Sequence, residues 1–401
     1  MFICRWCKNN DFITLWDLGD APYGDLFQES LSLSKSISKK SFVLVECNLC
    51  ELLQLRDRTD IESQYNNYLY KSNVTFGLSN AYLENSDFLI NQFLTPNSKI
   101  IDIGSNDGSF LKYFKQKGYW VLGIEPAKSA SEHANSLGIN TINAYFSSKL
   151  VDTELAELVN QIDLISVNYT LANIEDLSDF LTGISTLLKS DGILSITTGY
   201  HPDQFTVSMF DYIGHDHLTY FSLRNLVNIL ASMNFHLVEI KKSELKGGSI
   251  SLVAQKGYKK YSQPKYDYLI QRENWLWPNN RDGILQLTTR IDSAKKIVQE
   301  ELKKFDYKII GLGASISTTY LINYFDIHEK FQFLVDDDIA KIGKFSPFYG
   351  HKVISFSEAK NIGGSKFCVL AWQHTNQLIK RFYENDLKGS ILIPLPNPHW
   401  I

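Results

Sequence analysis

The chain has 401 residues, enough for two or three domains that each bury a core of their own. Its formal net charge is -4 with both signs interspersed, which gives no electrostatic basis for binding nucleic acid or an anionic membrane. Apolar runs are too short for a transmembrane helix, and the first residues lack the features of a secretory signal. We therefore expect a cytoplasmic protein that is a monomer or weak homo-oligomer, with neither nucleic acid nor membrane as partner.

Four of the five cysteines form two Cys-x-x-Cys pairs, Cys4/Cys7 and Cys47/Cys50. Two such turns supply four thiolates in a tetrahedron, the arrangement that zinc prefers in closed structural sites. A redox role is the alternative, although no βαβ pattern surrounds either pair. The pattern predicts a structural Zn2+ in a module over residues 1–72, which ends in a tyrosine-rich linker.

An isoleucine-rich run at 100–103 leads into a turn bounded by Gly104 and Gly108, and a helical pattern follows. A strand that hands over to a helix in this way leaves backbone N–H groups free for a nucleotide-like ligand. Asp102 precedes the turn, and Glu125 ends the next apolar run, where a carboxylate would bind a ribose diol. This Gly-x-x-x-Gly spacing resembles the S-adenosylmethionine loop of class I methyltransferases more than a nicotinamide site.

Strand and helix patterns alternate through residues 73–260. We expect helices at 82–94, 129–137 and 175–189, the last closed by a turn at 190–192, and strands ending at 104, 125, 143, 168 and 198. This alternation predicts an α/β domain with a doubly wound parallel sheet, whose ligand lies beyond the carboxyl ends of the strands. The resemblance to methyltransferases implies that S-adenosylmethionine contacts Asp102, Gly104, Ser105, Asn106, Gly108, Glu125, Asn143, Tyr145, Phe146 and Asn168.

Two histidines, His215 and His217, flank Asp216 in an aromatic stretch. Metal binding would need more ligands than this stretch supplies, and no His-Glu-x-x-His pattern occurs. Proton transfer is favoured, because an imidazole titrates near neutral pH and a carboxylate can fix its tautomer.

This stretch resembles the Tyr-His-Glu-His-Phe-Ser-Tyr-Phe-Ser signature of the sugar C-methyltransferases of unusual-deoxysugar biosynthesis. The match implies that His217 is the general base and Asp216 its acidic neighbour. Gly214 and Asn173 depart from the family, which usually has tyrosine and often histidine at these positions of the sugar pocket. The resemblance also implies sugar contacts from the linker tyrosines Tyr68 and Tyr70 and from the strand start Gly247-Gly248-Ser249. It places Tyr70 over the sugar, where the phenol can hydrogen-bond a sugar oxygen or the enolate that the base forms.

Residues 261–401 begin with a charged helical connector at 268–305 and continue with a second glycine turn at 311–315. Ile316 stands where a dinucleotide fingerprint has its third glycine, which disfavours a nicotinamide site. The resemblance, which spans nearly the whole chain, implies a Rossmann-like domain that helps to hold a nucleotide-sugar through Ser315 and His351.

Together these features predict an S-adenosylmethionine-dependent C-methyltransferase acting on a nucleotide-linked keto-deoxysugar. An O- or N-methyltransferase acting on a related carbohydrate is the first alternative. A non-catalytic binding module and an oxidoreductase using the second glycine turn remain alternatives from other classes.

Overall fold

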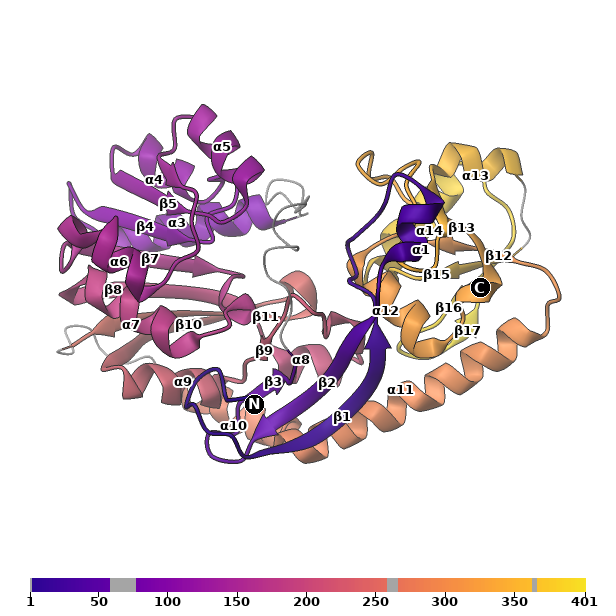
Figure 1. Cartoon of the computed structure of the whole chain (residues 1–401), viewed down its shortest axis with the longest axis horizontal. Coiled ribbons are helices and arrows are strands. Elements are labelled where there is room, and N and C mark those ends of the chain that lie inside the picture. Colours follow the sequence, from indigo (N-terminus) through magenta and orange to yellow (C-terminus); the bar gives the residue numbers. More distant parts are fainter. Residues whose placement is uncertain (1, 58–76, 258–265, 363–365) are drawn as a thin grey trace.

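The computed structural model describes residues 2–57, 77–257, 266–362 and 366–401. Three sheets organise this part of the chain (Figure 1). A four-stranded sheet has the order β1-β2-β3-β9, a central seven-stranded sheet β10-β11-β8-β7-β4-β5-β6, and a C-terminal six-stranded sheet β14-β13-β12-β15-β16-β17. None of the helices in the described ranges is both long and apolar enough to cross a membrane.

The central sheet has the predicted α/β organisation. Five parallel strands form its core: β4 (Lys99–Ile103), β5 (Trp120–Ile124), β6 (Thr141–Ile142), β7 (Ile162–Asn168) and β8 (Leu188–Gly199). Two antiparallel strands extend it, β10 (Phe235–Ser243) and β11 (Ser249–Lys256). Its helices are α3 (Leu78–Phe93), α4 (Leu111–Gln116), α5 (Lys128–Ser136), α6 (Ser148–Thr153), α7 (Leu177–Leu187), α8 (His201–Thr206) and α9 (Leu223–Ser232). The isoleucines of β4 are buried, as expected for a parallel strand covered on both faces.

One expected boundary in this domain was wrong. Helix α7 begins after its N-cap Asp176, whose side chain accepts from Asp179 N, and strand β8 follows α7 directly at Leu188. The turn expected at 190–192 therefore lies within β8. Lys189 pairs with Asp163 of the neighbouring β7 at 2.6 Å, which favours the extended conformation there.

The N-terminal sheet joins distant parts of the sequence. Strands β1 (Phe12–Ala21), β2 (Lys40–Cys47) and β3 (Leu53–Leu55) are consecutive, but β3 also pairs with β9 (Thr219–Tyr220). Helix α1 (Leu31–Ser36), between the two cysteine pairs, reaches the C-terminal domain, where Ser34 Oγ donates to the Ser346 carbonyl at 2.6 Å. The predicted module therefore packs against both other domains (Figure 1).

The C-terminal sheet has the Rossmann-like form. Its parallel strands are β12 (Ile309–Leu312), β13 (Phe331–Val335), β14 (Lys352–Ile354), β15 (Lys366–Val369) and β16 (Ser390–Ile393), and β17 (His399–Trp400) is antiparallel. The helices are α10 (Asp267–Leu276), α11 (Asn280–Lys303), α12 (Ile316–Phe325), α13 (Phe356–Ile362) and α14 (Thr375–Glu384). The expected connector is thus two helices, because the chain extends at Trp277, just before Pro278. Helix α11 runs beneath the N-terminal sheet towards the C-terminal sheet (Figure 1).

Short 3-10 helices supply several loops around the site described below. They are η2 (Ala156–Leu158), η3 (Leu171–Asn173), η4 (Phe210–Tyr212), η5 (Leu245–Gly247), η6 (His328–Lys330) and η7 (Trp372–His374).

Candidate active site

A cleft of about 1040 Å³ lies between the central and C-terminal sheets. This volume is at the upper end of the range for small-molecule sites, about 300–1,000 Å³, so two ligands fit together. The predicted site residues that line it are Gly104, Asn106, Glu125, Tyr145, Phe146, Asn168, Asn173, Asp216, His217, Gly247 and Ser315. The predicted residues that do not line it are Asp102, Ser105, Gly108, Asn143, His215, Gly248, Ser249 and His351. Tyr68 and Tyr70 lie outside the described residues.

The glycine turn after β4 forms one end of the cleft. Gly104 has φ +73°, and a Cβ at this position would collide with Thr170 Oγ1, so both its conformation and its close contact require glycine. Gly108 also has positive φ, but a Cβ there would meet Ile139 Cδ1 at 2.7 Å inside the core. The expectation that Gly108 faces the ligand was wrong, because this glycine allows the turn to pack against Ile139.

Glu125 connects the end of β5 to the glycine turn. Its carboxylate accepts hydrogen bonds from Asn106 N at 2.9 Å and Ala127 N at 2.7 Å, and burial raises its pKa. Each oxygen keeps a lone pair for a further donor, such as a ribose hydroxyl. Asn143 supports this strand end from outside the cleft, since its Nδ2 donates to the Glu125 carbonyl at 2.9 Å.

Asp102 lies behind the cleft wall. The carboxylate is 2% exposed and accepts from Ser166 Oγ at 2.6 Å and Asn168 Nδ2 at 3.3 Å. Burial raises the pKa of Asp102 to about 7. Asn168 Oδ1 is buried and has no hydrogen-bond partner within the described part of the chain, and Asn168 lines the cleft. An ammonium group on a ligand would satisfy this oxygen.

These residues fit S-adenosylmethionine, which carries a ribose diol and an amino-acid end. Glu125 would receive the ribose hydroxyls, and Asn168 would receive the ammonium group. Tyr145 and Phe146 follow β6 at the same edge of the sheet and offer aromatic surface to an adenine.

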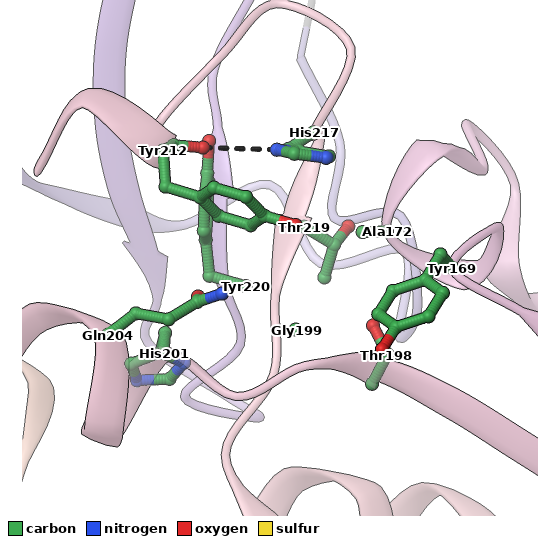
Figure 2. A pocket seen from close by; sticks show the side chains of 10 residues that line it. All are labelled: Tyr169, Ala172, Thr198, Gly199, His201, Gln204, Tyr212, His217, Thr219 and Tyr220. Carbon is green, nitrogen blue, oxygen red and sulfur yellow. Dashed lines mark hydrogen bonds between the residues drawn. The ribbon is translucent and has the colours of Figure 1, made fainter. Parts of the chain in front are cut away.

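His217 stands in the cleft wall with a fixed ring orientation (Figure 2). Its Nδ1 donates to the Tyr212 carbonyl at 3.0 Å, since a carbonyl oxygen can only accept, and the two rings pack with centroids 4.5 Å apart. Nε2 is therefore the nitrogen without a proton in the neutral ring. Strand pairing also holds this segment, because Leu55 N of β3 donates to the Leu218 carbonyl at 3.0 Å.

The expectation that Asp216 fixes the tautomer of His217 was wrong. Asp216 Oδ2 lies 3.9 Å from His217 Nε2, too far for a hydrogen bond and on the opposite side of the ring from Nδ1. The backbone of Tyr212 performs the orienting role instead. Sequence reasoning missed Tyr212 because the contact uses a carbonyl oxygen, which every residue type carries.

A small cavity of about 20 Å³ lies behind His217, and both His217 and Tyr212 form part of its wall (Figure 2). Two hydroxyls at its lining, Thr198 Oγ1 and Thr219 Oγ1, are buried and lack a hydrogen-bond partner among the described residues. One water needs roughly 10–15 Å³ by this measure and two or more polar partners. The cavity therefore has the size and polarity for a single water.

His215 packs within an aromatic cluster and is 2% exposed. Its ring lies 4.8 Å from that of Phe42 and 4.9 Å from that of Tyr23, and its backbone N donates to Tyr320 OH at 3.2 Å. Burial lowers the pKa of this imidazole. A catalytic role for His215 has no support in this geometry, because the ring does not reach the cleft.

His351 is likewise buried away from the cleft. Its Nε2 donates to the His328 carbonyl at 2.7 Å and its Nδ1 lies 3.2 Å from Ser346 Oγ, so both nitrogens are occupied. Burial lowers its pKa to about 4. The predicted substrate contact was wrong, since His351 stabilises the loop before β14.

The glycine pair before β11 divides between two roles. Gly247 lines the cleft, whereas a Cβ on Gly248 would approach Asp203 Cβ to 2.9 Å. Ser249 turns away and donates to the Leu245 carbonyl at 2.7 Å.

Gly214 and Asn173, the two positions that depart from the family motif, have different surroundings. Gly214 lines the cleft, and a Cβ there would lie 2.7 Å from Asp216 Oδ1 and 3.2 Å from the Tyr320 ring, so a larger residue would displace one of these side chains. Asn173 lines the cleft, and its buried Oδ1 has no partner within the described ranges, which leaves an acceptor for a ligand hydroxyl or amine.

The C-terminal wall of the cleft begins at α12. Ser315 caps this helix through a capping box with Thr318, and Ser317 Oγ lies 3.5 Å from Gln373 Oε1 of η7. All these residues except Thr318 line the cleft.

The four paired cysteines converge on one point. Their sulfur atoms lie within 4.8 Å of one another, with Cys7–Cys47 at 3.5 Å and Cys4–Cys50 at 3.6 Å. A tetrahedral site with Zn–S bonds of about 2.3 Å has sulfurs roughly 3.8 Å apart, so the cluster fits such an ion. Gln54 Nε2 donates to Cys4 Sγ at 3.3 Å.

This cysteine cluster is connected to the cleft wall through Arg5. The guanidinium is 1% exposed and pairs with Glu175, a cleft residue, at 3.3 Å. The Arg5 carbonyl accepts from Leu177 N at 3.0 Å, and Lys8 pairs with Asp176 at 2.5 Å. The turn that carries Cys4 and Cys7 therefore positions the loop between η3 and α7.

Comparisons with known proteins agree with this architecture. Residues 78–240 match a family model described as a methyltransferase domain, and residues 244–396 match one described as a C-methyltransferase C-terminal domain. The fold and these matches together indicate an S-adenosylmethionine-dependent methyltransferase of the class I α/β type.

Among individual proteins, the C-methyltransferase NovU of Streptomyces niveus is 25% identical over 408 residues, covering 99% of this chain and 96% of NovU. Solved structures include geranyl diphosphate C-methyltransferase of Streptomyces coelicolor A3(2), at 15% identity and a TM-score of 0.38, covering 49% of this chain and 97% of that one. A methyltransferase of Archaeoglobus fulgidus has 13% identity and a TM-score of 0.36, with coverage of 44% and 94%.

Proposed function

We propose that this enzyme methylates a carbon atom next to the ketone of a nucleotide-linked deoxysugar, with His217 as the general base. The observation that carries the proposal is the hydrogen bond of 3.0 Å from His217 Nδ1 to the Tyr212 carbonyl. It leaves Nε2 as a base in the same cleft as the cofactor residues Glu125 and Asn168. The matched C-methyltransferase C-terminal domain and the likeness to NovU support transfer to carbon.

The proton moves first in this proposal. His217 Nε2 takes the proton from the carbon beside the ketone, and the C–H electron pair becomes that of an enolate. S-adenosylmethionine supplies the methyl group on a positively charged sulfur, so that the C–C bond forms as the S–CH3 bond breaks. A positioned base contributes about 10²–10⁴-fold to such a reaction. Asp216, 3.9 Å from Nε2, stabilises the imidazolium and offers the proton a path to solvent.

A zinc ion in the four-cysteine cluster completes the proposal. Cys4 and Cys47 are buried and Cys7 and Cys50 are half-buried, and Gln54 Nε2 donates to Cys4 Sγ; four thiolates arranged in this way are typical of structural zinc. Metal analysis of the purified protein should give one zinc per chain, and the quadruple serine variant of the four cysteines should give none.

Solvent exchange tests the proposed chemistry. A keto-sugar nucleotide is incubated with the enzyme in D2O without S-adenosylmethionine, and deuterium at the carbon next to the ketone is measured by mass. The wild type should catalyse this exchange and His217→Asn should not, although the asparagine amide can still donate to the Tyr212 carbonyl. His133→Asn, on α5 away from the cleft, is the matched control.

Two results would contradict the proposal. Methyl transfer without exchange would favour an O- or N-methyltransferase, because only C-methylation requires that proton to leave. Undiminished exchange in His217→Asn would exclude His217 as the base.

A further inference from the structure

Asp211 connects η4, whose Tyr212 carbonyl orients the proposed base His217, to the C-terminal domain. This carboxylate lies in η4, next to Tyr212, and is 1% exposed. It accepts from Trp372 Nε1 at 2.8 Å, and Gln373 Nε2 lies 2.9 Å from both of its oxygens. Both donors belong to η7, which follows β15 of the C-terminal sheet.

The residue after Asp211 determines the geometry of His217. The Tyr212 carbonyl accepts from His217 Nδ1, and the Tyr212 ring packs against the imidazole (Figure 2). A displacement of η4 would therefore move the acceptor that selects the tautomer of the ring.

Gln373 contacts Asp211 on one side and lines the C-terminal wall of the cleft on the other. Its Nε2 donates to Asp211, and its Oε1 lies 3.5 Å from Ser317 Oγ at the start of α12. Gln373 and Ser317 line the cleft, and so does Asp211, although its side chain is 1% exposed. A ligand at this wall of the cleft would therefore lie next to the amide that anchors Asp211.

We propose that Asp211 is a positioning residue, which makes the orientation of His217 depend on how the C-terminal domain is docked. The path runs from Gln373 and Trp372 through Asp211 to the Tyr212 carbonyl and then to the imidazole. Burial raises the pKa of Asp211 to about 7, and the three donated contacts favour its ionised form. The inference rests on the proposed role of His217 as the base.

Paired substitutions separate positioning from stability. Asp211→Leu leaves the Trp372 and Gln373 donors buried without an acceptor, so it should lower both the melting temperature and kcat. Adding Gln373→Met removes one unsatisfied donor, and removal of both partners is close to neutral for folding. The double variant should therefore regain much of the melting temperature, whereas kcat should stay about 10- to 100-fold below the wild type, the range expected for a misplaced base.

Two further variants complete the experiment. Asp211→Asn should retain most of the activity. If the Gln373 amide rotates by half a turn, its oxygen accepts from the new asparagine NH2 group and its own NH2 group donates to Ser317 Oγ. Arg281→Met is the matched control, because it breaks a different contact between domains, the ion pair with Glu46 at 3.1 Å, far from η4. It should leave kcat unchanged. Affinity for S-adenosylhomocysteine should stay within about twofold of the wild type in all variants.

The outcomes distinguish this inference from the proposed function. Absent turnover in the wild type would contradict the proposed function itself. Wild-type turnover together with an Asp211→Leu/Gln373→Met variant of normal kcat would overturn the positioning role alone. Loss of kcat in strict proportion to melting temperature across the series would also overturn it.

Discussion

Replacing Glu125 by glutamine tests the cofactor half of the cleft most sharply. The carboxylate accepts from Asn106 N at 2.9 Å and Ala127 N at 2.7 Å. A glutamine keeps one acceptor and directs its NH2 group at the other backbone donor. The backbone donor left without a partner lowers stability with or without ligand, whereas the ribose would lose a charge-assisted hydrogen bond worth about 1.5–3 kcal/mol of binding free energy. Since 1.4 kcal/mol is tenfold, we expect S-adenosylhomocysteine to bind roughly 10- to 100-fold more weakly.

Isothermal titration calorimetry with S-adenosylhomocysteine measures this effect. Glu132→Gln on α5 is the control, because the Glu132 side chain is 66% exposed and its ion pair, at 3.8 Å, is with the exposed Lys128. Thermal unfolding of the ligand-free variants shows whether Glu125→Gln is folded. A folded Glu125→Gln variant that binds within twofold of the wild type would refute the assignment of Glu125 to the ribose.

Three further predictions concern the glycine turn, the buried Asp102 before it and the four-cysteine cluster. Burial raises the pKa of Asp102 to about 7, so the unfolded chain loses this proton at a lower pH than the folded chain. The free energy of unfolding therefore falls as pH rises from about 4 to 7, and the full penalty is present above pH 7. Asp102→Asn should therefore raise the ligand-free melting temperature at pH 8 relative to the wild type, where Asp102 is ionised and buried; equal melting temperatures at pH 8 would contradict this. Gly104→Ala should lower the free energy of unfolding, measured with urea, by at least about 1–2 kcal/mol, and Thr170→Ala should restore part of it by removing the clash. An unchanged free energy of unfolding would contradict the left-handed conformation and close contact described for Gly104. With the proposed zinc in the four-cysteine cluster, its removal by a chelator should lower the melting temperature and increase hydrogen exchange at 171–177 and 218–220, while β12 and β15 stay protected; uniform exchange would contradict the path through Arg5.

The sequence predicted the central fold well because its signals are local. Buried isoleucines before Gly104 and the acid at the end of β5 identify a parallel strand, its turn and the next strand end. The two cysteine pairs likewise predicted one cluster, which the structure brings together within 4.8 Å. Both features are recognisable from the types of residue and their spacing along the chain.

The errors at the site arise from tertiary contacts. Nothing near His215 in the sequence shows that Phe42 and Tyr320 enclose its ring. Asp216 adjoins His217 in the chain, yet it is the backbone carbonyl of Tyr212 that accepts the hydrogen bond from His217 Nδ1. Gly108 matched a ligand-binding spacing, although its contact is with Ile139 in the core.

The part played by the C-terminal domain was also beyond sequence reasoning. A second glycine turn drew attention to Ser315, whereas the contacts of Trp372 and Gln373 with Asp211 join residues about 160 positions apart and follow no motif.

The site of methylation tests the central claim most directly. S-adenosylmethionine with a 13C-labelled methyl group is incubated with the enzyme and a panel of keto-sugar nucleotides, and the product is studied by NMR. The proposal predicts that the labelled methyl is bonded to the ring carbon next to the ketone, with no product from His217→Asn. A labelled methyl on oxygen or nitrogen would contradict it.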